Sequence, residues 1–409
     1  MPIEGSLFLI LLIPLALAGL TVLNAGLVRS RSSAHMMLAS MCAVSVAVLV
    51  FVIVGFSFAG FGSAGYALHL AGRDWNVIGT GRLFARSVTF DGSAAPLILL
   101  LQMFSVGLAA LIPVAGGAER WRLAAIAAST SALAAIVYPV FAHWASAEGW
   151  LGQLGFLDAG GAASIQALGG ITALCVAWLL GSRQNKFTSE GIPTAMPGHN
   201  ATLVLFGSLL ALTGWLGLNL AGAALIDTHL LPLAAINTVL SAAAGALGAL
   251  VTTRFHFGKP DASLTANGFV AGLVSISASA PYVKPAAAIL IGLVAGPLIV
   301  FAIEFVEVHM HVDDPAGVIS VHGLAAIWGL LALSMFADHG SFLAQALAIA
   351  TLLGIILPLS YGLNLLLNRF VPYRVEPSGE RQGMDLFELG AGAYPEFVTH
   401  REDRSPIRH

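Results

Sequence analysis

Eleven apolar stretches, each close to 20 residues, follow one another along almost the whole chain of 409 residues. A helix of that length spans about 30 Å, the thickness of the hydrocarbon core of a bilayer, where a helix satisfies its own backbone groups. The stretches cover about residues 7–28, 36–59, 95–117, 123–144, 160–181, 200–224, 230–252, 262–281, 285–306, 317–336 and 342–367. We therefore predict an all-α membrane protein with eleven transmembrane helices.

The composition agrees with that prediction and excludes several classes of partner. Only 10% of the residues are charged, against about 25% in soluble domains, and the net charge of −3 gives no electrostatic footprint for nucleic acid. Cys42 and Cys175 both lie in apolar stretches, so we expect no disulfide framework or thiolate metal site. The lipid bilayer is the predicted partner, and no cofactor is expected. The first stretch is read as a retained span, with a cleaved signal as the alternative.

A motif that occurs twice gives the chain its organisation. Asp158 stands eight residues before Gln166, and Asp314 stands eight residues before His322. Each motif opens an apolar, glycine-rich stretch. Internal repeats of membrane transport proteins place their site at the midplane where the repeats meet, so Gln166 and His322 are the first candidates for a pore.

The repeat predicts the domain organisation. Repeat A covers about residues 7–181 and repeat B about residues 200–336, with five helices each and therefore opposite orientations. The last helix, at about 342–367, stands outside the repeat. We predict one transmembrane domain over residues 1–369 and a cytoplasmic tail over residues 370–409.

Basic residues are distributed unevenly between alternate loops. One set of loops and the tail hold fourteen of the eighteen Lys and Arg residues, and the other set holds four, three of them in the long 60–94 loop. Since basic residues are retained on the cytoplasmic side, we predict a multi-pass protein of the plasma (inner) membrane with the N-terminus outside and the C-terminus in the cytoplasm.

Several short motifs along the chain resemble the ammonium transporter (Amt/Rh) family. They are Gly26–Ser30, Ala118–Arg120, Leu157–Gly161, Pro197–Asn200, Gly214–Asn219, Val321–Gly323, Gly383–Asp385 and Ala393–Pro395. The resemblance extends from the first helix to the tail in the family's order. It implies a homotrimer with one narrow conduction path through each eleven-helix subunit.

In that family, one histidine on the fifth helix and one on the tenth face each other in the pore. Gln166 stands at the first position and His322 at the second. The chain therefore resembles a divergent member of the family that lacks the first pore histidine. Because glutamine carries no titratable proton near neutral pH, we predict a broken proton relay in which the polar contact with a neutral amine survives.

The outer side also departs from the family pattern. Ser105 and Leu218 stand where two stacked phenylalanines usually close the pore entrance, and Phe104 is the neighbouring aromatic residue that could replace one of them. A shift of one position rotates a helical side chain by about 100°. The entrance gate is therefore assigned to these three residues as an expectation.

The external cation site differs in the same way. Ser146 and Gly222 stand where the family has a tryptophan and a serine, and Trp144 is the nearest substitute. Asp158 and Asn219 match the family. These five residues form the predicted vestibule for cation recruitment, although Asp158, like Asp314, also stands where a carboxylate caps a helix.

The resemblance implies an ammonium/ammonia permease and not an enzyme. Two alternatives stay open: a transport-impaired member that binds ammonium and reports it, and a channel for another small neutral molecule such as carbon dioxide or water. In the family, a tail of this kind lies against the cytoplasmic face, and a PII-type regulator can block the exit. Gly383, Asp385, Gly390 and Tyr394 match that tail, whereas Leu389 replaces a usual histidine.

One acidic and histidine-rich cluster suggests a different function. It consists of Glu304, Glu307, His309, His311, Asp313 and Asp314. These residue types can hold a metal, but the spacing lacks the HExxH pattern of a metalloenzyme. We interpret the cluster as a solvated vestibule face and predict no metal site.

Overall fold

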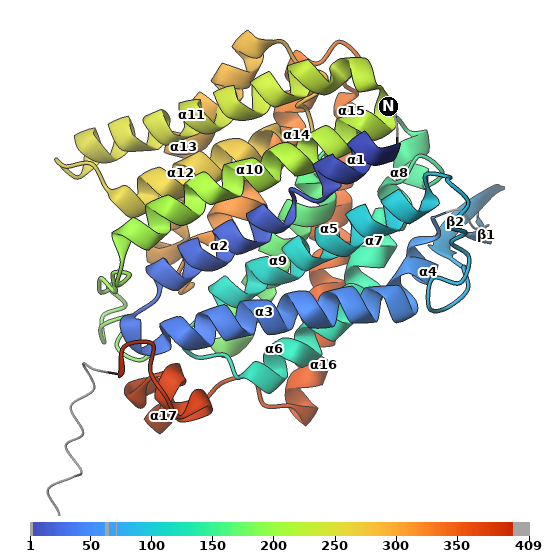
Figure 1. Ribbon diagram of the computed structural model, residues 1–409. Coiled ribbons are helices and arrows are strands. Elements are labelled where there is room, and N and C mark those ends of the chain that lie inside the picture. The colour runs from blue at the N-terminus through green and yellow to red at the C-terminus, as the bar shows by residue number, and fades with distance from the viewer. Residues whose placement is uncertain (1–2, 62–64, 71, 396–409) are drawn as a thin grey trace, which may run out of the picture.

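The computed structural model describes residues 3–61, 65–70 and 72–395, and its long helices lie side by side in one bundle (Figure 1). The helices of the first half are α1 (Ile3–Ile10), α2 (Pro14–Leu27), α3 (Ser33–Val50), α4 (Phe56–Ala59), α5 (Ala95–Gly116), α6 (Leu123–Ala132), α7 (Tyr138–Ala145), α8 (Trp150–Gln153) and α9 (Leu168–Leu180). Those of the second half and tail are α10 (Ala201–Ile226), α11 (Leu231–His256), α12 (Ala262–Ile276), α13 (Pro285–Val308), α14 (Ala325–Phe336), α15 (Phe342–Thr351), α16 (Leu357–Phe370) and α17 (Pro377–Gln382).

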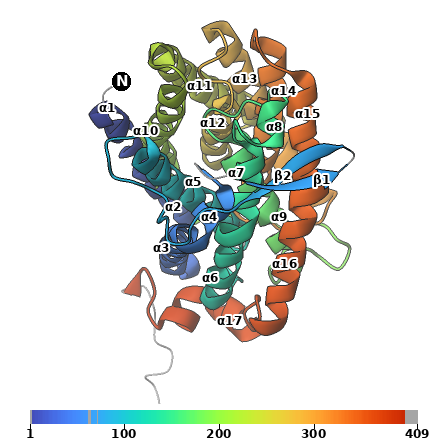
Figure 2. The same ribbon diagram turned by 90° about the vertical axis from the view of Figure 1, so that its right-hand side faces the viewer.

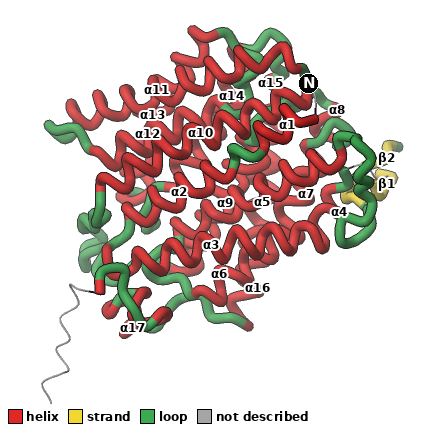
Figure 3. Tube along the Cα trace, in the orientation of Figure 1, coloured by secondary structure: helices red, strands yellow, loops and turns green. Residues whose placement is uncertain are grey.

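Short helical turns of other types connect or extend these helices. The π-helical turns are η2 (Phe51–Gly55), η3 (Leu133–Val137), η4 (Ala162–Ala167), η6 (Ile319–Leu324), η7 (Leu352–Ile356) and η8 (Asp385–Leu389), and the 3₁₀ turns are η1 (Ser30–Ser32) and η5 (Thr228–Leu230). Through η2, η3 and η7, pairs of α-helices become single long helices that continue across the bundle (Figure 3).

The predicted all-α membrane fold is confirmed. Among the described residues, ten helices are long and apolar enough to cross a membrane. The eleventh predicted window contains α12, which is apolar but only 15 residues long. It stops at Ile276 because the next two carbonyls bind another segment: Ser277 accepts from the Gly160 amide at 2.8 Å, and Ala278 from the Ala159 amide at 3.3 Å.

The long 60–94 loop contains a β-hairpin that the sequence analysis did not predict. Strand β1 (Gly65–Leu70) pairs antiparallel with β2 (Arg73–Gly79), with Leu70 opposite Arg73. Gly72 has φ +73°, a conformation that glycine adopts without steric cost. The hairpin projects from one end of the bundle, which we call the hairpin face (Figure 2). The opposite end, where α17 lies, is the tail face (Figure 1).

The tail segment is fixed to the tail face by carboxylates that cap helices. Asp385 accepts hydrogen bonds from the backbone amides of His35 (2.7 Å) and Ala34 (3.2 Å) at the start of α3. Glu388 accepts from the Leu123 amide at the start of α6 (2.9 Å) and bonds to the His35 ring (2.8 Å). The remaining part of the predicted tail, residues 396–409, lies outside the described residues.

Glycines allow the long helices to approach each other closely. A Cβ added to Gly214 of α10 would overlap the backbone of Ala16 in α2. A Cβ on Gly292 of α13 would overlap the Ser241 carbonyl of α11. Backbone cannot move aside as a side chain can, so these glycines set the helix separations.

We expect Gly214→Ala to destabilise the protein by about 1–3 kcal/mol, since its methyl group must push α2 away from α10. Thermal denaturation of the purified protein in detergent measures the effect. Gly362→Ala is the matched control, because a Cβ there meets nothing within 4 Å and alanine favours helix by about 1 kcal/mol. A lower melting temperature in the control than in Gly214→Ala contradicts the prediction.

Candidate functional site

The two pore candidates meet in the interior of the bundle. Nδ1 of His322 lies 2.7 Å from Oε1 of Gln166, and the two residues are 2% and 0% exposed. Gln166 belongs to η4 and His322 to η6. The repeat therefore brings together two side chains that are 156 residues apart.

The same local structure positions both side chains. Gly161 and Gly317, each three residues after the aspartate, have φ +77° and +71°. Gly161 directly precedes η4, and Gly317 lies two residues before η6. The Asp158 carboxylate accepts from the Ser164 amide at 2.9 Å, and the Asp314 carboxylate accepts from the Ile319 amide at 2.7 Å. Both aspartates thus cap their helix, as the repeat predicts. The π-helical turns themselves, which often occur at functional sites, had no sequence signal.

Two further features bring the repeats into contact at the site. A Cβ on Gly170 in α9 would overlap the backbone of Gly323 beside His322, so a larger residue there would separate the helices. Trp215 of α10 stacks on the His322 ring, with centroids 6.5 Å apart and planes inclined by 30°. Its indole donates to Ser277 Oγ at 3.1 Å. Trp215 was not among the predicted site residues, although it lies in the Gly214–Asn219 motif.

The pair leaves one donor and one acceptor for a small guest. Because Nδ1 of His322 donates to the Gln166 carbonyl oxygen, Nε2 of the neutral ring is an acceptor. Nε2 of the Gln166 amide is buried and has no hydrogen-bond partner in the described part of the chain. A molecule that both accepts and donates hydrogen bonds, as a neutral amine does, matches this arrangement.

A cavity of about 160 Å³ lies on the hairpin side of the pair and contains two of the predicted vestibule residues, Asp158 and Ser146. Tyr138 also lines it, and its hydroxyl donates to Gln102 Oε1 at 2.5 Å. Burial raises the pKa of Asp158, and hydrogen bonds from Ser164 and Ala163 act in the opposite direction. No basic side chain within the described ranges forms an ion pair with Asp158, so its charge is available to a cation.

Ser146 and Trp144 are held by other interactions. The Ser146 hydroxyl donates to the His143 carbonyl (2.8 Å) and accepts from the Gly149 amide (3.2 Å), which closes the turn after α7. The Trp144 indole donates to the Val77 carbonyl of β2 at 2.7 Å. Trp144 is therefore tied to the hairpin and is absent from the residues that line the 160 Å³ cavity.

Gly222 and Asn219 lie against the Asp158 turn. A Cβ on Gly222 would overlap the Ala159 carbonyl, so no serine fits there without a backbone shift. Asn219 donates to Thr238 Oγ1 at 2.9 Å, and its own Oδ1 has no partner among the described residues. Both residues thus place the turn that carries Asp158.

The three predicted gate residues do not line the hairpin-side cavity. The Ser105 hydroxyl bonds back to the Leu101 carbonyl of its own helix at 2.8 Å, Leu218 is buried, and Phe104 is partly buried. The gate assignment stays a prediction.

A larger cavity of about 670 Å³ opens on the tail side and is lined by Asp314, Glu304 and Glu307 of the acidic cluster. Glu307 pairs with Lys186 (2.5 Å), and Glu304 pairs with His256 (3.1 Å). Burial raises the pKa of Asp314 to about 6. The described residues contain no group of three or more metal-binding side chains. The solvated vestibule face stays a prediction.

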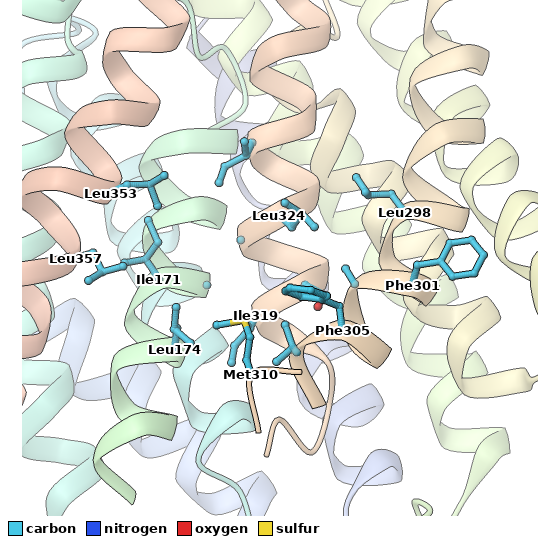
Figure 4. Close-up of a pocket in the computed structure, with 16 residues that line it drawn as sticks. Ile171, Leu174, Leu298, Phe301, Phe305, Met310, Ile319, Leu324, Leu353 and Leu357 are labelled. Atoms are coloured by element: carbon cyan, nitrogen blue, oxygen red, sulfur yellow. The ribbon is translucent and has the colours of Figure 1, made fainter. Parts of the chain in front are cut away.

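A third cavity, of about 490 Å³, is apolar and lies beside the pair (Figure 4). Leu174 of α9, Leu298 and Phe305 of α13, and Leu353 of η7 line it, whereas Gln166 and His322 do not. It is a lateral pocket between membrane helices and offers no polar route.

The bundle of membrane helices, the two matching aspartate turns and the buried Gln166–His322 pair are typical of a membrane transport protein. The model of the Ammonium Transporter Family matches residues 6–394. Ammonium transporter Amt2 of Archaeoglobus fulgidus is 33% identical over 93% of this chain and 85% of its own, and the ammonium transporter of Bacillus subtilis is 28% identical over 96% and 98%. The chain belongs to the Ammonium Transporter Family, which confirms the resemblance seen in the sequence.

Solved structures agree. A protein described as a sensor Amt protein superimposes with a TM-score of 0.84 at 28% identity, covering 94% of this chain and 96% of that one. Mep2 of Saccharomyces cerevisiae superimposes with a TM-score of 0.79 at 25% identity, covering 90% and 86%.

Proposed function

We propose that this protein is an ammonium/ammonia permease that conducts its substrate past Gln166 and His322 through a narrow apolar pore. The observation that carries the proposal is the buried contact of 2.7 Å between the two side chains, which leaves one donor and one acceptor free. The family relatives named as ammonium transporters support the choice of substrate.

The physics of the interior favours the neutral amine. An unpaired cation in a dry apolar path loses its hydration at a cost of many kcal/mol. Deprotonating an amine with a pKa of roughly 9–10 at neutral pH costs only about 3–4 kcal/mol. Potassium has no proton to lose and is excluded. The Asp158 cavity recruits the cation, and the tail-side cavity releases the product into water.

The further architecture follows the family. The 1–369 region forms one transmembrane domain of two inverted repeats and a final helix, and the matched Asp158 and Asp314 turns support that repeat. Three subunits form a homotrimer in the plasma membrane, with the hairpin face and N-terminus outside and the tail face in the cytoplasm. A PII-type regulator binds at the tail face, where Asp385 and Glu388 anchor the described part of the tail.

Uptake of ammonium and methylammonium into liposomes tests the function. We expect His322→Ala to reduce ammonium uptake about five- to tenfold, since it removes the acceptor and strands the Gln166 amide. His339→Ala, at an exposed histidine on the hairpin side, is the control and should transport like the wild type. Equal uptake by liposomes with and without the wild-type protein would refute the permease function.

A sensor is the second candidate, favoured by the similarity to the solved sensor Amt protein and by the glutamine in the relay. In that case the protein binds ammonium without passing it. Calorimetric binding of ammonium to the purified protein, combined with no flux in the liposome assay, assigns the sensor function instead.

A further inference from the structure

A small polar cavity on the tail face lies next to the 670 Å³ tail-side cavity and shares Met196 with it. Its volume is about 200 Å³, and it lies between the segment after α2, the loop after α9 and α17. Its lining consists of Arg29, Arg31, Gln184, Asn185, Met196, Glu380 and Arg381. Three guanidinium groups and one carboxylate therefore line the same cavity.

Both oxygens of the Glu380 carboxylate already have partners. Oε2 of Glu380 pairs with Nη2 of Arg374 at 2.9 Å, and Oε1 accepts a hydrogen bond from the Gln184 amide. Because Arg374 is not among the lining residues, Glu380 neutralises a charge outside the cavity. It also attracts Arg31, but one carboxylate that is shared with Arg374 does not balance three arginines.

The three arginines are poorly compensated. Arg29 pairs with Glu119, but the other oxygen of Glu119 is held by Arg183 at 2.7 Å, so one carboxylate serves two guanidiniums. Arg31 and Arg381 are exposed and have no hydrogen bond or ion pair with any described residue. The cavity thus has an excess of positive charge and unused N–H donors.

We propose that this cavity binds a phosphate group, either free in solution or as the headgroup phosphate of an anionic lipid. Guanidinium groups bind phosphate oxygens through paired N–H donors, which Arg31 and Arg381 have free. The volume of 200 Å³ is below the roughly 300–1,000 Å³ of sites for drug-sized ligands and suits one phosphate group. Bound phosphate joins α17 to the loop after α2, so it strengthens the contact of the tail with the bundle.

This site goes beyond transport and does not depend on it. The test uses the full-length protein in nanodiscs and measures binding of inorganic phosphate by isothermal titration calorimetry. One arm measures this binding in discs of phosphatidylcholine. The other arm measures the melting temperature in discs with added phosphatidylglycerol and no inorganic phosphate. Arg31→Gln, Arg381→Gln and the double variant are compared with Arg369→Gln, an exposed arginine outside the cavity.

We expect saturable phosphate binding that is at least tenfold weaker in the double variant and unchanged in Arg369→Gln. If only the phosphatidylglycerol discs give a stabilisation that the double variant loses, the phosphate comes from lipid. The melting temperature in phosphatidylcholine discs without phosphate shows that each variant is folded. Absence of a response in both arms, or equal responses from the double variant and Arg369→Gln, overturns the proposal.

Discussion

Replacing Gln166 with histidine should increase ammonium-dependent current on the order of a hundredfold, the range that one positioned proton-transfer group provides. The wild-type pair includes only one titratable side chain, His322, whose Nδ1 already donates to the Gln166 amide. A second imidazole at that distance gives the proton a continuous path. Currents of proteoliposomes on a solid-supported membrane measure the change.

Gln166→Asn is the matched control for this variant. It keeps an amide but adds no titratable group, so its current should not rise above the wild-type level. Robust ammonium currents from the wild type itself would show that Gln166 does not interrupt proton coupling, and the hypothesis of a broken relay would then be wrong.

Arg183→Leu should lower the free energy of unfolding by about 3–5 kcal/mol. The buried Arg183 guanidinium binds Asp313 at 2.9 Å and Glu119 at 2.7 Å. Its loss leaves each buried carboxylate with a single arginine partner, Arg120 for Asp313 and Arg29 for Glu119. Thermal denaturation in detergent at neutral pH measures the loss. Glu304→Gln, in an ion pair whose side chains are 40% and 46% exposed, is the control and should cost at most about 1 kcal/mol.

The same pair predicts a dependence on pH. Burial alone would raise the pKa of Asp313, but Arg120 and Arg183 outweigh it and lower the pKa to about 2. The stabilisation from the charged Asp313 is therefore present above the ordinary pKa of about 3.9 and is lost as the pH falls towards 2. In Arg183→Leu, this loss should begin at a higher pH. If protonation of Asp313 already lowered the wild-type melting temperature between pH 7 and 5, the assignment of a low pKa to Asp313 would be wrong.

Much of the candidate site was accessible from the sequence because it depends on local patterns. Apolar length predicted the membrane helices, and the spacing from Asp158 to Gln166 and from Asp314 to His322 predicted which side chains meet. Both aspartates cap their helices as expected. The assignment of Ser146, Trp144 and Gly222 to a vestibule came from alignment alone. In the structure, Ser146 closes the turn after α7, Trp144 donates a hydrogen bond to the hairpin, and Gly222 leaves room for the Ala159 carbonyl.

Trp215 could not be selected from the sequence as the residue that stacks on His322. Its position depends on how α10 of repeat B packs against α2 of repeat A. Close backbone contacts such as that of Gly214 with Ala16 set this packing. The basic cavity on the tail face combines residues from three distant segments, and no local pattern connects Arg31 with Arg381.

The sequence by itself determined that this chain is a bundle of membrane helices with a repeated motif, because burial in lipid acts on every window of about 20 residues independently. Only the tertiary structure decided that an amide and an imidazole share one hydrogen bond while a donor and an acceptor stay free. That outcome depends on how the π-helical turns η4 and η6 orient Gln166 and His322 toward each other. Their orientation is fixed by packing between segments far apart in the chain, such as Gly170 against Gly323.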